Sequence, residues 1–152
     1  MSQVLDGVRV LDFGRYIAGP CCGMMLGDLG ADVIRIEKID GSEDRYTAPI
    51  GEGADGEISV GSGYLHLNRN KRGLTLNPMK PEGQEIVKRL VATADVVIAN
   101  LPTETLEAMG LDYDSLRAVK EDIILTTVSA FSSVGPYKDR VGFDGIAAAM
   151  SG

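Results

Sequence analysis

The sequence has few aromatic residues and a deficit of positive charge. Among its 152 residues are three Phe, five Tyr and no Trp, and the formal net charge at pH 7 is −7. Nucleic-acid binding needs clustered Lys and Arg, and binding of single strands also needs aromatic side chains on which bases stack. We therefore expect no nucleic-acid partner, whereas a small anionic ligand would need only a few local cations.

Long hydrophobic runs and well-spaced cysteines are also absent. No stretch approaches the roughly 18 apolar residues that a membrane-spanning helix needs, and residues 1–13 lack the basic and apolar segments of a signal peptide. The two cysteines, Cys21 and Cys22, are neighbours in the sequence, which suits a structural disulfide poorly. These absences predict a cytoplasmic protein with no membrane partner.

Strand and helix signals alternate along the chain. Apolar runs typical of buried strands lie at 8–13, 32–37, 73–76, 96–99 and 123–129. Helical periodicity or end signals lie at 21–29, 81–91, 103–109, 112–118 and 147–151. This alternation predicts one α/β domain over residues 1–152, with a mostly parallel sheet covered by helices on both faces. Residues 38–63 are rich in glycine and lack periodicity, so a long loop is expected there.

Several residues mark the expected helix ends. Gly30 and Gly110 are placed to end helices in the left-handed conformation, and Pro81 suits a first helical turn. Asp112 or Asp114 is expected to cap the helix that runs to residue 118. The buried stripe of the helix after Pro81 is expected to consist of Ile86, Val87, Leu90 and Val91.

Ligands of parallel sheets bind beyond the carboxyl ends of the strands. The segments expected at that edge are 14–20, 38–45, 66–72, 100–105 and 130–144. Residues 68–72, Asn-Arg-Asn-Lys-Arg, are compatible with a solvated charge run or with a phosphate-binding loop. Glu37 ends the second expected strand, where an acidic residue often holds a ribose hydroxyl, although a solvated strand end is an equal alternative.

The loop after the first expected strand matches neither common nucleotide-binding motif. Gly14, Gly19 and Gly23 do not fit G-x-G-x-x-G, and Pro20 stands where a P-loop has its phosphate-binding Lys. An NAD-linked oxidoreductase is therefore disfavoured, and NAD is not expected as a cofactor. The loop still leads into a helix N-terminus beside Arg15, where an anion could bind, although a simple turn is an equal alternative.

Nucleophilic pairs and metal sites find little support in the sequence. Cys21 or Cys22, at a helix start, could act as a nucleophile. However, the single histidine, His66, is distant in the sequence, and packing roles are the alternative for all three residues. No set of His, Cys, Asp and Glu has the spacing of a metal site, so no metal is expected.

Seven sequence segments follow one another in a distinctive order and spacing. They are LDGVRVLDF (5–13), AGP (18–20), LGDLGADVIRIE (26–37), NRNKRGLTL (68–76), PEGQEIVKRLVATADVVIAN (81–100), LEAMGLDYDSL (106–116) and GPYKDRVGFDGIAAAMSG (135–152). Together they resemble the class III CoA-transferase family, which includes formyl-CoA transferase, carnitine CoA-transferase-like proteins and α-methylacyl-CoA racemase. The resemblance implies a Rossmann-like domain that holds CoA at the strand ends, within a longer enzyme that forms an interlocked homodimer.

The same resemblance implies a covalent mechanism with acyl-CoA and a carboxylic acid as small-molecule substrates, and without metal or NAD. An aspartate attacks the thioester to give an acyl-aspartyl anhydride, CoA thiolate converts this to an aspartyl-CoA thioester, and the acceptor carboxylate takes over the CoA through a second anhydride. Backbone N–H groups are expected to hold the developing oxyanions. The aspartate is expected beyond Gly152, so we expect no catalytic residue and no transfer activity in this chain alone.

Positions that match the family's CoA-contacting motifs are spread over several segments. The resemblance implies CoA contacts at Arg15, Tyr16, Ile17, Ala18, Lys38, Asn70, Lys71, Arg72, Leu76, Asn100, Leu101, Thr105 and Met109. Residues 15–18 would lie at the thiol end, 70–76 near the adenosine and phosphates, and 100–109 along the pantetheine and adenine. Phe143 and Asp144 are implied as supporting residues, and Asp144 is not the expected nucleophile.

Departures from the family pattern refine this expectation. Ile17 replaces a glutamine of formyl-CoA transferase, which argues against a formyl- or oxalate-specific role. Residues 76–79, Leu-Asn-Pro-Met, replace a common Leu-Asp-Leu-Lys, and Lys80 is displaced by one position. Phe143 replaces the histidine that transfers a proton in racemases, so a transferase is favoured over a racemase. A stand-alone nucleotide-binding module is the non-enzymatic alternative.

Overall fold

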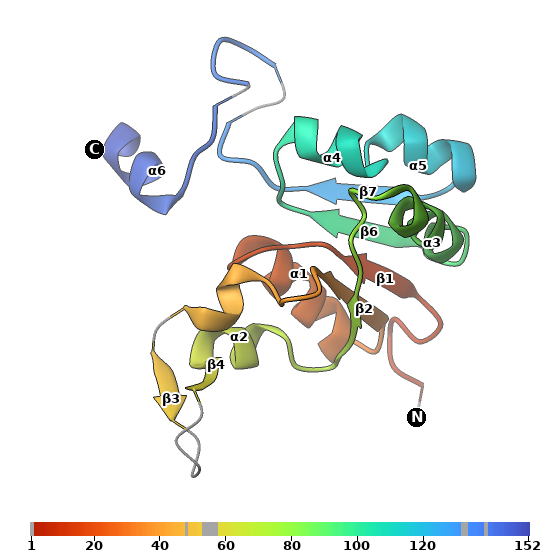
Figure 1. Ribbon diagram of the computed structural model, residues 1–152, viewed down its shortest axis with the longest axis horizontal. Helices are drawn as coiled ribbons and strands as arrows, with labels where there is room; N and C mark the ends of the chain where they lie inside the picture. Colours follow the sequence, from red (N-terminus) through yellow and green to blue (C-terminus); the bar gives the residue numbers. More distant parts are fainter. Residues whose placement is uncertain (1, 48, 53–57, 132–133, 139) are drawn as a thin grey trace.

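A five-stranded sheet forms the centre of the computed structural model, which describes residues 2–47, 49–52, 58–131, 134–138 and 140–152 (Figure 1). Its strand order is β5-β2-β1-β6-β7, and every neighbouring pair is parallel. The strands are β1 (Arg9–Asp12), β2 (Asp32–Glu37), β5 (Lys71–Thr75), β6 (Val96–Ala99) and β7 (Ile124–Thr127). The predicted parallel α/β architecture is therefore confirmed.

Helices cover both faces of the sheet, as the sequence predicts (Figure 1). The helix α1 (Ala18–Asp28) packs on one face, where its Leu26 contacts a core cluster that includes Val10 and Val33. On the other face lie α3 (Pro81–Val91), α4 (Thr103–Met109) and α5 (Tyr113–Val119), which share a second cluster with Leu11 and Ile36. Successive residues of a strand point to opposite faces, so β1 and β2 supply both clusters.

The predicted helix signals are largely confirmed. Gly30 and Gly110 adopt φ of +104° and +68° behind α1 and α4, the left-handed conformation expected of them. Asp112 caps α5 by accepting a hydrogen bond from the Ser115 N–H at 3.0 Å. In α3, Val87 and Val91 are buried, but Ile86 is 39% exposed, so its assignment to the buried stripe is wrong.

The prediction of one long loop over residues 38–63 is wrong. This region contains a 3₁₀ helix η1 (Glu43–Tyr46), an antiparallel pair β3 (Ile50–Glu52) and β4 (Ile58–Gly61), and the start of α2 (Ser62–Leu67). Residues 53–57 lie outside the described part of the chain. These elements lack internal periodicity because they are short and held by contacts to distant residues.

The sequence predicts segment 66–72 at the carboxyl edge of the sheet, and this prediction is wrong. The segment leads into β5, which begins at Lys71 rather than at Gly73, and therefore meets the amino end of that strand. The carboxyl edge is formed instead by the residues that follow Asp12, Glu37, Thr75 and Ala99.

Beyond β7 the chain leaves the sheet and ends in α6 (Asp144–Ser151), which lies apart from the other helices (Figure 1). The helix begins three residues before the expected 147–151. No helix in the described part of the chain combines the length and the apolar character needed to cross a membrane.

Candidate functional site

The loop between β1 and α1 is built on a close approach of two glycines. A Cβ atom on Gly14 would lie 2.8 Å from the Gly19 Cα, and one on Gly19 would lie 2.7 Å from the Gly14 Cα. Real Cβ contacts are not this short, so only glycine fits at either position. The approach folds residues 14–19 back on themselves at the carboxyl end of β1.

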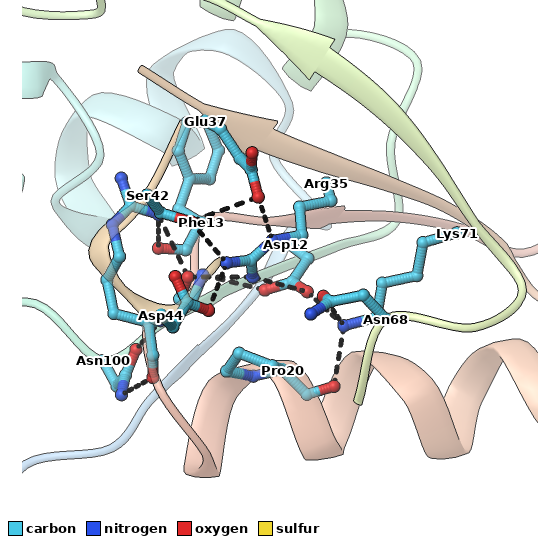
Figure 2. A network of polar contacts seen from close by, with 12 residues as sticks. Asp12, Phe13, Pro20, Arg35, Glu37, Ser42, Asp44, Asn68, Lys71 and Asn100 are labelled. Carbon is cyan, nitrogen blue, oxygen red and sulfur yellow. Dashed lines mark hydrogen bonds and ion pairs between the residues drawn. The ribbon is translucent and has the colours of Figure 1, made fainter. Parts of the chain in front are cut away.

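Side chains from β1, from β2 and from the residue that follows β6 hold the main chain of this loop. The Gly14 N–H donates to Asp12 Oδ1 at 2.8 Å, and Arg35 Nη1 donates to the Gly14 carbonyl at 3.0 Å. Asn100 accepts from the Arg15 N–H at 2.5 Å and donates through Nδ2 to the Arg15 carbonyl at 2.8 Å (Figure 2). All four main-chain polar groups of Gly14 and Arg15 are therefore bonded to side chains.

The next residue, Tyr16, has φ of +57°, which is costly for a residue with a Cβ. Tyr16 and Ile17 are 43% and 69% exposed. The Tyr16 ring meets Phe143 edge-on, with ring centroids 6.2 Å apart. The loop thus presents its side chains outward and contacts the segment that precedes α6.

A network of buried charges lies directly behind the loop (Figure 2). Arg35, only 2% exposed, donates through Nε to Glu37 at 2.8 Å and through Nη2 to Asp44 at 2.7 Å, and its Nη1 lies 3.6 Å from Asp12. Lys71 Nζ, equally buried, donates to Asp12 Oδ2 at 2.8 Å and to the Pro20 carbonyl at 2.7 Å. The network joins β1, β2, β5, α1 and η1 into one unit.

Glu37 receives more hydrogen bonds than any other carboxylate in this network. Arg45 Nε donates to its Oε2 at 2.6 Å, while Ser42 Oγ and Tyr64 OH donate to Oε1 at 3.1 and 2.8 Å. Burial alone would raise the pKa of Glu37, but these donors and Arg35 lower it to about 2. Burial and the bond to Glu37 raise the pKa of Tyr64 to about 12. Glu37 is therefore a buried, ion-paired residue and not a solvated strand end.

A pocket of about 390 Å³ opens at the carboxyl ends of β1, β2 and β5. It brings together four residues that the sequence assigns to CoA: Arg15, Lys38, Leu76 and Met109. The family resemblance implies no CoA contact for the other lining residues, which are Phe13, Ile36, Glu37, Ile39, Asp40, Asn77, Pro78 and Met79. Most of these directly follow the ends of β1, β2 and β5, a position that could have identified them.

Arg15 supplies positive charge to the pocket. It donates through Nη1 to the Phe13 and Gly14 carbonyls at 3.2 and 3.0 Å. Within the described part of the chain it forms no ion pair, whereas Lys38 pairs with Glu43. Burial and the nearby Arg35 lower the pKa of Arg15, but a guanidinium stays charged near neutral pH. Asp44, Glu43 and Glu37 act on this charge from a distance, but none of them pairs with it directly, so the guanidinium keeps donors for an anionic group in the pocket.

Other expected CoA-binding residues lie away from this pocket. Arg72 pairs with Asp32 at 2.7 Å, and Asn70 donates to Asp28 at 2.8 Å, both near the amino end of β5. Lys71 points into the buried network. Leu101 packs against the core, and Thr105 lies on α4 without lining the pocket. Ala18 is the first residue of α1, and Asp144 is the first residue of α6.

Burial raises the pKa of the Cys22 thiol, as does the nearby Asp12, which opposes formation of a nucleophilic thiolate. The part of the chain that the structure describes contains no group of three or more His, Cys, Asp and Glu side chains able to hold a metal ion.

Comparison with known proteins gives a consistent result. The family model described as CoA-transferase family III matches residues 5–152. A succinate–glutarate CoA-transferase of Agrobacterium fabrum is 44% identical over 150 residues, and the human succinyl-CoA:glutarate CoA-transferase is 38% identical over 149. Each alignment covers 97% of this chain but only 38% and 33% of the respective relative, so the chain spans about a third of their length.

A solved structure agrees with these sequence matches. The crystal structure of a CAIB/BAIF family protein from Brucella suis superposes with a TM-score of 0.89 at 40% identity. The superposition covers 99% of this chain and 39% of that one.

Proposed function

Because this chain belongs to CoA-transferase family III, we propose that it forms the CoA-binding α/β portion of an enzyme that moves CoA from an acyl-CoA to a carboxylic acid. The observation that carries this proposal is the pocket at the carboxyl ends of β1, β2 and β5. Four of the residues expected to contact CoA converge there from four separate segments, at the edge where parallel sheets bind ligands.

The chemistry of the pocket suits an acyl-CoA. Its volume lies in the range of small-molecule sites, and apolar side chains such as Leu76 and Met109 form much of its wall. Arg15 supplies a guanidinium suited to phosphate or carboxylate oxygens. These features support a ligand with both an apolar and an anionic part.

For the reaction we propose the aspartyl mechanism that the family resemblance implies, with the nucleophile outside these 152 residues. Attack of the aspartate on the thioester forms the anhydride and expels CoA thiolate, and the thiolate then attacks the aspartyl carbonyl and expels the donor acid. The acceptor carboxylate displaces CoA through a second anhydride, and CoA attack on the acyl carbon regenerates the aspartate. The residues of this chain bind CoA and hold loop 14–17 at the pocket.

The named relatives act on succinyl-CoA, succinate and glutarate. We propose a dicarboxylic acid as one substrate of the whole enzyme, since Arg15 offers a guanidinium at the pocket wall that has no direct carboxylate partner in the described part of the chain. Phe143 favours this transferase function over a racemase, because a phenyl ring carries no exchangeable proton.

Titration calorimetry of the 152-residue chain with CoA and with NAD tests the binding proposal. We expect saturable CoA binding and no comparable NAD binding. Arg15→Ala should weaken CoA binding about tenfold, because it removes a charged hydrogen-bond donor from the pocket. Arg89→Ala, an exposed arginine of α3, is the matched control and should leave the affinity unchanged. Equal effects of the two substitutions, or tighter binding of NAD than of CoA, would contradict the proposal.

A further inference from the structure

Asn100 uses both groups of its side-chain amide on the main chain of one other residue. Oδ1 accepts from the Arg15 N–H at 2.5 Å, and Nδ2 donates to the Arg15 carbonyl at 2.8 Å. Asn100 directly follows β6, which pairs with β1, so the two loops leave neighbouring strands side by side (Figure 2). A side-chain amide is the group that can satisfy an N–H donor and a carbonyl acceptor together.

The loop held in this way contains an unfavourable conformation. Tyr16 has φ of +57°, and the approach of Gly14 to Gly19 in the first turn of α1 leaves no room for a Cβ atom at either position. Strained conformations of this kind persist only where the surroundings fix them. Asn100 acts next to the strained residue, on Arg15, while Asp12 and Arg35 hold Gly14.

The same geometry separates Asn100 from the pocket. Arg15 lines the pocket wall and Asn100 does not. We propose that Asn100 is a positioning residue, which fixes the main chain of residues 14–17 so that the Arg15 side chain lies along the pocket. This inference rests on the proposed function only in treating the pocket as the CoA site.

We call the two hydrogen bonds from the Asn100 side chain to the Arg15 main chain the clamp. The substitution Asn100→Asp tests the clamp with little change in the shape of the side chain. At about pH 8 the carboxylate still accepts from the Arg15 N–H, but its second oxygen faces the Arg15 carbonyl and cannot donate. Near pH 5 a carboxyl held against a carbonyl becomes protonated, because that environment disfavours its charged form, and the donor returns. Lowering the pH should therefore restore the lost hydrogen bond in Asn100→Asp. The second variant is Asn100→Ala, whose side chain cannot form the bond at either pH.

Two measurements on the ligand-free and CoA-titrated chain decide the question. Hydrogen exchange of the Arg15 amide, followed by NMR without ligand, reports on the loop, and calorimetry with CoA reports on the pocket. For Asn100→Asp at about pH 8 we expect exchange about tenfold faster and CoA binding about tenfold weaker, the effect of one lost hydrogen bond. The exchange rate of the Arg15 amide and the affinity for CoA should both return toward the wild-type values near pH 5 in Asn100→Asp, but not in Asn100→Ala.

The controls separate this effect from general titration and from fold loss. Wild-type protein at both pH values accounts for the intrinsic pH dependence of amide exchange and for ionisation of the CoA phosphates. Gln84→Glu makes the same amide-to-acid exchange at a side chain that donates to the Ala108 carbonyl at 2.8 Å, and it should change neither readout.

Each outcome has a distinct meaning. Weaker CoA binding by Asn100→Asp with an unchanged Arg15 amide would overturn the inference, because Asn100 would then contact the ligand directly. An unchanged affinity and an unchanged amide would overturn it as well. If wild-type protein fails to bind CoA, the proposed function fails, while the ligand-free exchange of the Arg15 amide still decides whether Asn100 fixes the loop.

Discussion

Individual charged residues in the interior of this sheet are stabilised by their partners rather than by water. Asp12, Arg35 and Glu37 stand at strand positions where apolar side chains are usual, and each is at most 3% exposed. An unpaired charge at such a site is strongly unfavourable. Replacing any one of these residues by a neutral one would therefore destabilise the fold, because its partners would be left uncompensated. The sequence shows these charges, but not their pairing, because Asp44 and Tyr64 reach them from elements that the sequence did not predict.

Stability should depend on pH through Glu37. Its pKa falls from 4.5 to about 2 in the folded protein, so its contribution is complete above pH 4.5 and is lost as the pH falls toward 2. That shift corresponds to about 3 kcal/mol at neutral pH. Urea unfolding should show Glu37→Gln destabilised by about this amount at pH 7, with the difference from wild type shrinking below pH 4.5. Exposed Glu85→Gln is the control, and an equal pH dependence of both variants would contradict the assignment.

At the scale of elements, the turn from β1 into α1 depends on glycine at two positions. A Cβ on Gly19 would also lie 3.0 Å from Asn100 Oδ1, so Gly19→Ala must displace either Gly14 or the clamp. We expect a loss of about 1–3 kcal/mol, typical of overpacking. Gly63→Ala in α2 meets nothing within 4 Å and should be neutral or slightly stabilising. Thermal unfolding of the two variants measures the difference between their stabilities. Equal melting temperatures would contradict the close approach of Gly14 and Gly19.

The strands and helices differ from the 38–63 region in how far local sequence determines them. Runs such as Val96–Ala99 are apolar because both faces of the sheet are covered, so they were predictable with their bounds. The 3₁₀ helix η1 instead depends on Arg35 and Glu37, which precede it and lie on another element. The clamp between Asn100 and Arg15 joins residues 85 positions apart. Family resemblance implies CoA contacts for both residues, but only the structure shows that Arg15 lines the pocket whereas the Asn100 side chain binds the Arg15 main chain.

The whole molecule combines a well-packed sheet with a C-terminal region that buries little. Between residues 134 and 152 no described side chain is buried, and several large apolar ones are strongly exposed. These include Val134, Val141, Phe143, Ile146 and Met150. Soluble monomers rarely expose so many apolar side chains along one segment.

We therefore expect the 152-residue chain to self-associate through this region. Sedimentation velocity should show an average mass that rises with concentration, because association buries apolar surface. The double substitution Phe143→Ser and Met150→Ser should reduce the association, since both side chains are more than 60% exposed and make little contribution to the core. Val4→Ser, at an isolated apolar residue that is 85% exposed, is the control and should not alter it. A single monomer boundary at every concentration of the unsubstituted chain would show instead that the C-terminal region remains solvated.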